Sequence, residues 1–201
     1  NGMVFVRGQS HDYDHWSQLG NPGWSFQEVL PFFKKMEAST FGSDMFRGRN
    51  GPLRVIQPKE TGPLYDAMFA AAREIGIQKN CDYNGEFQDG VAMTQATISR
   101  GKRQSTAVAY LNPARYRKNL TVLTDSYVTK LILKDKKCMG IEYLKNNTTY
   151  KVLANKEVIV CSGTINSPQL LELSGIGDAE IIKDKGINVE RNLPGVGQNL
   201  R

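Results

Sequence analysis

The stretch from Ile159 to Gly177, IVCSGTINSPQLLELSGIG, constrains the fold most, because an apolar run ends at a glycine and a helical pattern follows it. The run VIVCSG at residues 158–163 is nearly all apolar, which is typical of a strand buried on both faces of a parallel sheet. Ser167 and Pro168 fit the N-cap and the first position of the next helix. We therefore expect the strand–turn–helix half of a nucleotide-binding unit, whose helix N–H groups favour an anion or a polar ligand near Ser162.

Ser162 also raises an alternative role, that of an acyl-transfer nucleophile. The nucleophile elbow of hydrolases has the pattern GxSxG, and VCSGT lacks the first glycine. The two histidines that could serve as a base, His11 and His15, lie far upstream in a polar stretch. We favour the other interpretation, in which Ser162 is a small residue that lets a ligand approach the backbone.

The segment HDYDH places His11 and His15 four residues apart, the spacing at which two histidines on one helix face can bind a metal. The glutamate that follows the first histidine in zinc proteases is absent, and no third ligand is specified. The favoured interpretation is that these residues form the polar side of a lid-like segment anchored by Tyr13 and Trp16.

Other helices are indicated by their end signals. Ser25 and Glu28 fit a capping box for a helix in WSFQEVLPFFKKME, which Pro31 should end or kink. A second helix is predicted in PLYDAMFAAAREIG, with Pro63 at its first position and Gly76 just past its end. A short helix is expected in STAVAYLNP at residues 105–113, with its last proline as the stop.

The strand signals gather in the second half of the chain. Two strands are expected earlier, LRVIQ at residues 53–57 and VAMTQATIS at residues 91–99. After residue 119 the chain has β character, with LTVLTD, YVTKLIL, CMGIEYL and YKVLA in succession. Short polar turns separate the last three runs, which predicts an antiparallel meander with one face in water.

Composition excludes some classes of function. The chain of 201 residues is 40% hydrophobic, enough for a globular core. Its net charge of +6 is dispersed among acids, and no basic stripe with interleaved aromatic residues indicates a nucleic-acid partner. No apolar run approaches the roughly 18 residues of a membrane span. Neither Gly175-Ile-Gly177 nor Gly195-Val-Gly197 completes the dinucleotide fingerprint GxGxxG.

Cysteines and glycosylation sequons say less about function. Cys81, Cys138 and Cys161 are too few and too scattered for a disulfide framework or a paired zinc site. Three Asn-x-Thr sequons begin at Asn119, Asn146 and Asn147, and they would be acceptors in a secreted protein.

Four segments together resemble the glucose-methanol-choline (GMC) oxidoreductases, most closely the insect glucose dehydrogenase branch. They are RGQSHDYDHWSQLGNPGWSFQEVLPFFKKME, GKRQSTAVAYLNPARYRKNLTVLTDSYVTKL, CSGTINSPQLLELSGIG and LPGVGQNL, in the order found in that family. The resemblance, which extends to choline dehydrogenases, implies a flavoprotein with FAD as cofactor. It implies hydride transfer from an alcohol or sugar carbon to the flavin N5, with oxygen or a quinone as electron acceptor.

The resemblance also implies a fold class of α+β / α/β. This consists of a partial Rossmann-like FAD-binding domain with an antiparallel β-meander, and of a partial substrate-binding antiparallel sheet with helices. Residues 1–36 would be an FAD-domain segment with the lid, 37–115 mainly the substrate-binding or cap domain, and 116–201 a second FAD-domain segment.

The residues that the resemblance places at the cofactor are Asn1, Gly2, Met3, Val128, Cys161, Ser162 and Gly163. The first three match the family's Asn-x-Met stretch beside the isoalloxazine ring, and residues 12–24 resemble the lid. Val128 would offer its backbone to the adenine, and residues 161–163 would lie near the adenosine ribose. The predicted strand–helix turn, derived from the residues alone, also requires a nucleotide there.

Departures from the family pattern qualify what this chain does by itself. The family's GxGxxG is expected upstream of Asn1 and its catalytic histidine beyond residue 201, so no catalytic residue is assigned here and the chain is expected to be an inactive N-terminal-half fragment. A non-catalytic GMC-like binding module is the alternative. The sequons and the insect-like resemblance favour an extracellular location.

Overall fold

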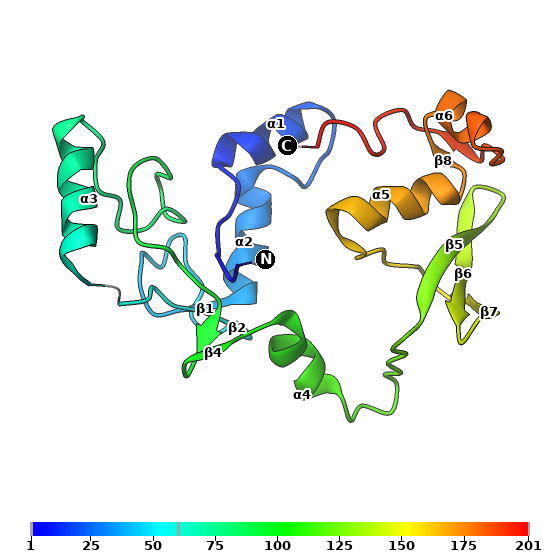
Figure 1. Cartoon of the computed structure of the whole chain (residues 1–201), viewed down its shortest axis with the longest axis horizontal. Coiled ribbons are helices and arrows are strands. Elements are labelled where there is room, and N and C mark those ends of the chain that lie inside the picture. Colours follow the sequence, from blue (N-terminus) through cyan, green and yellow to red (C-terminus); the bar gives the residue numbers. More distant parts are fainter. Residues whose placement is uncertain (1, 60, 201) are drawn as a thin grey trace. The chain divides into compact units, whose positions relative to one another are not determined.

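The computed structural model describes residues 2–59 and 61–200, which form two compact units divided between Leu120 and Thr121 (Figure 1). The predicted boundary at residue 115 lies close to this division. The assignment of residues 1–36, 37–115 and 116–201 to FAD-binding and substrate-binding domains stays a prediction, since it concerns their roles.

The first unit contains the helices α1 (Ser10–Gln18), α2 (Phe26–Met36) and α3 (Pro63–Glu74). The predicted capping box of α2 is confirmed, because the Ser25 backbone N–H donates to Glu28 Oε2 at 3.1 Å. Pro31 was expected to end or kink this helix; it does not end it but lies inside it. The proline removes only the bond to the carbonyl four residues back, and the neighbouring turns keep the helix intact. In α3 the predicted proline start is confirmed.

The first unit also contains two pairs of short strands. β1 (Glu37–Ser39) pairs in parallel with β2 (Leu53–Val55), and β3 (Ile98–Ser99) pairs antiparallel with β4 (Lys102–Arg103). The core consists of Phe5, Leu53, Val55 and Ala109, with Met36 and Phe41 packed against it.

The predicted strand at residues 91–99 is wrong for most of its length. Only Ile98–Ser99 is a strand, while Val91 and Ala96 make isolated bridges. The backbone of this segment makes scattered bonds to several partners instead of a continuous ladder: the Gln95 N–H donates to the Tyr83 hydroxyl at 2.7 Å, whereas Ala96 exchanges two backbone bonds with Ile56. β-branched composition alone therefore misled the prediction.

The helix expected at residues 105–113 is a π turn, η1 (Ala107–Leu111), continued by α4 (Asn112–Ala114). The Ser105 Oγ, one residue before the N-cap Thr106, accepts the Val108 N–H at 3.3 Å. Pro113 does not stop the helix; it is the second residue of α4, within the continuous η1–α4 segment, where it removes one backbone N–H donor.

The second unit is built on the predicted meander, which is confirmed. β5 (Tyr127–Lys134), β6 (Lys137–Lys145) and β7 (Thr148–Leu153) form one antiparallel sheet in the order β5-β6-β7. The turns at residues 135–136 and 146–147 have positive φ at both positions, typical of type I′ hairpins. LTVLTD at residues 120–125 does not form a strand.

The strand–turn–helix at the start of α5 (Gly163–Leu173) differs from the prediction in two respects. The helix begins at Gly163, which takes φ +92°, and Pro168 lies inside it instead of opening it. No strand forms at residues 158–161, and Ile159 is 76% exposed. The apolar run signals burial, but a strand also needs a neighbouring strand to bond to, and the described residues supply none there. β8 (Ile176–Gly177) pairs in parallel with β9 (Arg191–Asn192), around α6 (Ala179–Asp184).

Ser174, just past α5, ties this helix to the sheet. Its hydroxyl donates to the Leu170 carbonyl at 2.6 Å and accepts the Leu131 N–H of β5 at 2.9 Å, and the residue is 1% exposed. We predict that Ser174→Ala lowers the free energy of unfolding by about 1–3 kcal/mol, because a buried N–H loses its acceptor.

Urea unfolding measures this effect, with Ser167→Ala in the same helix as the control. The Ser167 hydroxyl makes no hydrogen bond among the described residues and the residue is half-buried, so its replacement should change stability by less than about 0.5 kcal/mol. Equal losses of stability in the two variants would contradict the role of the Ser174 hydroxyl in holding α5 to β5.

Candidate functional site

A small cleft lies between β5 and α5 in the second unit. Its volume is about 250 Å³, and it is lined by Ser126, Tyr127, Val128, Ser162, Asn166, Gln169, Leu170 and Leu173. The cleft brings together two of the residues predicted at the cofactor, Val128 and Ser162, from segments far apart in the sequence.

The position of β5 makes Val128 available to a ligand. β5 is an edge strand whose neighbour in the described sheet is β6, so one row of its backbone groups is not used by the ladder. The pairing also shifts between Val128 and Lys130, and such bulges re-aim the strand next to functional sites. The Ser174 bonds hold α5 at the same strand, which fixes the width of the cleft.

The turn before α5 presents Ser162 at the other wall. Cys161 and Gly163 flank it without lining the cleft, and Cys161 is an exposed free cysteine. A Cβ added to Gly163 would meet nothing within 4 Å, so this glycine is needed for its φ of +92° and not for space. Among the described residues, Ser162 makes no hydrogen bond to a histidine, and the nucleophile alternative gains no support.

The chemistry of the cleft fits a neutral, flat, polar-edged group. None of its lining residues carries a charge: Ser126, Ser162, Asn166 and Gln169 offer hydroxyl and amide groups, while Leu170 and Leu173 provide apolar surface. Such a mixture of apolar walls and a few polar groups is characteristic of sites for small organic ligands. An adenine ring has matching apolar faces and hydrogen-bonding edges, so the lining fits the adenine of FAD.

The other predicted cofactor residues belong to the first unit. Asn1 lies outside the described residues. Gly2 is exposed, and Met3 adopts φ +67°, which is uncommon for any residue except glycine. The Met3 carbonyl accepts the Thr97 N–H at 2.9 Å and its hydroxyl at 3.3 Å.

The segment after Met3 is held by a buried network of charges and amides that the sequence did not reveal. Arg47 donates from Nε and Nη2 to the two oxygens of Glu37, at 2.9 and 3.1 Å, and from Nη1 to Asp82 at 2.6 Å. Arg7 pairs with Glu37 at 2.9 Å. Two cations thus face two carboxylates, which satisfies the requirement that buried charges be paired.

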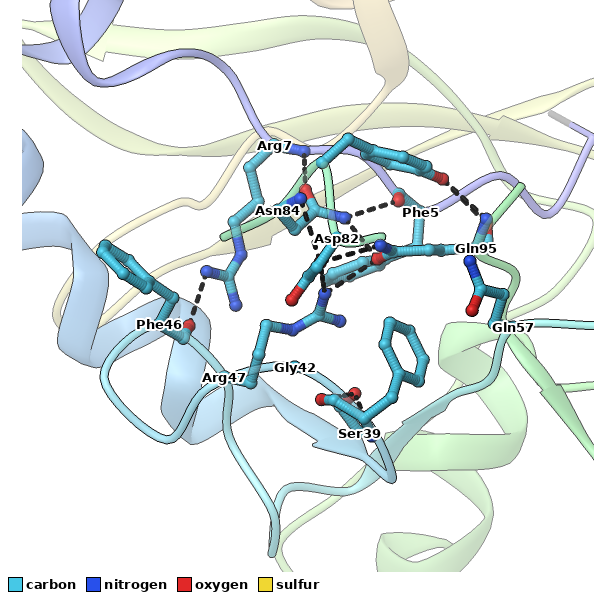
Figure 2. A network of polar contacts seen from close by, with 12 residues as sticks. Phe5, Arg7, Ser39, Gly42, Phe46, Arg47, Gln57, Asp82, Asn84 and Gln95 are labelled. Carbon is cyan, nitrogen blue, oxygen red and sulfur yellow. Dashed lines mark hydrogen bonds and ion pairs between the residues drawn. The ribbon is translucent and has the colours of Figure 1, made fainter. Parts of the chain in front are cut away.

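Two amide side chains complete this network (Figure 2). Gln95 Oε1 accepts from Arg47 at 2.8 Å and from Asn84 at 2.7 Å, and Asn84 also donates to the Phe5 carbonyl at 2.9 Å. Burial lowers the pKa of Arg7, and the carboxylate of Glu37 opposes that shift. The pKa of the Tyr83 hydroxyl is raised, chiefly by burial.

One signal in the sequence could have pointed to the network. Three glycines surround Arg47, at positions 42, 48 and 51, and each is a close approach. A Cβ on Gly48 would overlap the Lys34 carbonyl, and one on Gly51 would overlap the backbone of Met36. Gly48 and Gly51 thus let the chain beside Arg47 run against the backbone at the end of α2, and Gly42 leaves room for the Arg47 side chain.

The HDYDH segment forms α1, in which Tyr13 packs against Trp16 at 5.4 Å and Phe33 at 5.6 Å between ring centroids. The Asp14 carboxylate accepts the Phe26 N–H, the first of α2, at 2.9 Å. No group of three metal-ligating side chains occurs among residues 2–59 and 61–200. The role of this segment as a lid stays a prediction.

In the part of the chain that the structure describes, no helix combines the length and apolar character needed to cross a bilayer.

Known proteins match this chain along its whole length. Residues 1–201 match the model of the family described as GMC oxidoreductase. An oxygen-dependent choline dehydrogenase from Brucella anthropi is 45% identical over 201 residues, which are 100% of this chain and 36% of that protein. The chain therefore spans about a third of the length of this relative.

Solved structures share the fold. An FAD-dependent oxidoreductase from Chaetomium thermophilum superposes with a TM-score of 0.91 at 33% identity, covering 99% of this chain and 37% of that one. Pyridoxine 4-oxidase from Mesorbium loti gives a TM-score of 0.87 at 31% identity, covering 96% of this chain and 38% of that one. The helices and small sheets described above are thus a partial α/β architecture shared with FAD enzymes, and the predicted fold class is confirmed. On the full-length match, the chain belongs to the GMC oxidoreductase family.

Proposed function

We propose that this chain is part of an FAD-dependent oxidoreductase that acts on CH–OH groups, and that the cleft of its second unit binds the adenosine part of FAD. The observation that carries the proposal is the uncharged cleft that joins Val128 to Ser162 in a chain matched over its whole length to GMC oxidoreductases. Cys161 and Gly163, which flank Ser162 beside the cleft, would lie near the adenosine ribose. When bound, FAD supplies a hydride acceptor for the alcohol carbon.

In the first unit, we assign Asn1, Gly2 and Met3 to contacts with the isoalloxazine ring. The assignment rests on the family's Asn-x-Met stretch and is supported by the constrained backbone of Met3. Residues 12–24 would cover the cofactor as a lid.

The substrate we propose is a small alcohol of the choline type. The name of the Brucella relative, 45% identical to this chain, supports a choline-like alcohol over a sugar, the substrate class of the insect glucose dehydrogenase branch. That name also favours oxygen over a quinone as the electron acceptor.

The missing catalytic groups are assigned to other parts of the full-length protein. This chain holds no complete GxGxxG, and its two histidines lie in the lid-like segment. The 201 residues alone should therefore bind FAD weakly and turn over no substrate, because the pyrophosphate site and the proton acceptor are supplied elsewhere.

The test is anaerobic reduction of the FAD-loaded full-length protein by choline, glucose and pyridoxine in turn, followed at the flavin absorbance band. We expect choline to bleach the flavin faster than glucose does. Bleaching by glucose alone would restore the sugar dehydrogenase interpretation. A full-length protein that takes up no FAD would overturn the enzyme proposal and favour the non-catalytic module.

We also propose that the protein is extracellular. Asn119, Asn146 and Asn147, the three sequon residues, are all exposed, as acceptors for glycans must be. A mass loss on glycosidase treatment of the protein from its native source would support this location, and an unmodified mass at all three sites would argue against it.

A further inference from the structure

Met3 is held in a conformation that it would not adopt freely. Its φ of +67° lies in the left-handed region, where a side chain crowds the backbone. Such residues persist only where the surroundings impose the conformation, and they cluster at functional sites. The Met3 carbonyl is bound by two donors of one residue, the Thr97 N–H at 2.9 Å and the Thr97 hydroxyl at 3.3 Å.

Thr97 belongs to residues 95–97, here called the template, which bond to the segment that begins at Met3. Ala96 bridges to Val4 on one side and to Ile56 on the other, where two backbone bonds of 2.8 and 2.9 Å join Ala96 and Ile56. Gln95 accepts the Phe5 N–H at 2.8 Å. Residues 95–97 therefore hold residues 3–5 along their whole length.

The template is anchored in the buried network. Gln95 is completely buried, and its side chain bonds to Arg47, Asp82 and Asn84 at 2.7 to 2.8 Å. Figure 2 shows these side chains converging on Gln95. Thr97 thus binds Met3 from a segment that the Gln95 side chain anchors through three hydrogen bonds, and the neighbour of Met3, Gly2, is exposed.

We propose that Thr97 is a positioning residue: it holds Met3 in the left-handed conformation and so fixes the Gly2–Met3 backbone against the flavin ring. This inference rests on the proposed function, in which that backbone contacts the isoalloxazine. Thr97 itself acts through Met3 and does not touch the ring.

The strain is tested first in the flavin-free full-length protein, by comparing Met3→Gly with Met3→Ala. Both variants lose the side chain, but only glycine accepts a positive φ without crowding. We expect Met3→Gly to melt at a higher temperature than Met3→Ala. The opposite order, which holds at ordinary φ values, would remove the basis of the proposal.

The positioning is tested in the FAD-loaded protein with Thr97→Val, which keeps the shape but removes the hydroxyl bond. We expect a shifted midpoint potential and an altered visible spectrum of the flavin, with flavin reduction about 10-fold slower, because misplaced reacting groups lose rate steeply. Thr97→Ser, which keeps the hydroxyl, should have the potential, the spectrum and the reduction rate of the wild type.

Ser39→Ala is the control in the same unit, since the Ser39 hydroxyl also donates to a backbone carbonyl, that of Phe41, at 2.9 Å. It should leave the flavin potential unchanged. A Thr97→Val flavin with wild-type potential and spectrum would overturn the inference while leaving the proposed function intact. A wild-type protein that binds no FAD would instead overturn the proposed function, and the positioning role with it.

Discussion

Replacing Arg47 with methionine should lower the free energy of unfolding of the first unit by about 3–5 kcal/mol, the cost of breaking a buried ion pair from one side. Arg47 is 1% exposed and donates four hydrogen bonds, two to Glu37, one to Asp82 and one to Gln95. Methionine fills much of the same volume but leaves both carboxylates without these donors. Urea unfolding of the full-length protein, followed by circular dichroism and by tryptophan fluorescence, measures the loss.

Asp44→Asn is the control for this substitution, because it breaks an ion pair of the same unit at the surface. Asp44 pairs with Arg49 at 2.6 Å, and its side chain is 84% exposed. Exposed pairs contribute about 0–1 kcal/mol, so this variant should unfold almost like the wild type. Similar losses in the two variants would mean that the buried network is not what stabilises the unit.

Gly42→Ala should destabilise the same unit by about 2–5 kcal/mol, the sum of left-handed strain and overpacking. Gly42 has φ +77°, and a Cβ there would overlap Asp82 Oδ2 and lie 2.8 Å from Arg47 Cγ. The added methyl group therefore pushes apart the ion pair that Arg47 makes with Asp82. The same unfolding measurement reports the effect.

Gly23→Ala separates the strain from the overlap. Gly23 has φ +87°, but a Cβ there would meet nothing within 4 Å. This control should cost only about 1–2 kcal/mol of left-handed strain. If Gly42→Ala lowered the free energy of unfolding no more than Gly23→Ala does, the close packing described around Asp82 and Arg47 would be contradicted.

Local signals in the sequence predicted the elements whose ends and turns carry specific chemistry. The Ser25–Glu28 cap, the Pro63 start of α3 and the meander β5-β6-β7 were all predictable, because capping side chains, helix-start prolines and I′ turns act within a few residues. The effects of three prolines were predicted less well. Pro31 and Pro113 do not end their helices and Pro168 does not open α5, because all three lie inside helices.

The remaining features depend on contacts between distant residues. Residues 158–161 have the composition of a buried strand, yet strand formation requires a partner that composition cannot reveal. Nor does any local pattern show that Arg47 will meet Glu37, Asp82 and Gln95 in the core. Val128 and Ser162 were predicted at one cofactor through the family resemblance, and the fold places them in one cleft, but binding itself stays a prediction.

The affinity for FAD tests the proposed cofactor site most directly. It is measured by titrating the flavin-free full-length protein with FAD, and the variant Ser162→Leu is compared with Thr164→Leu. Ser162 lines the cleft and makes no cap bond, whereas Thr164 is exposed on the same helix and does not line it. We expect Ser162→Leu to weaken FAD binding at least about 10-fold, a loss of about 1.4 kcal/mol, and Thr164→Leu to bind like the wild type. Wild-type affinity in Ser162→Leu would contradict the assignment of this cleft to FAD.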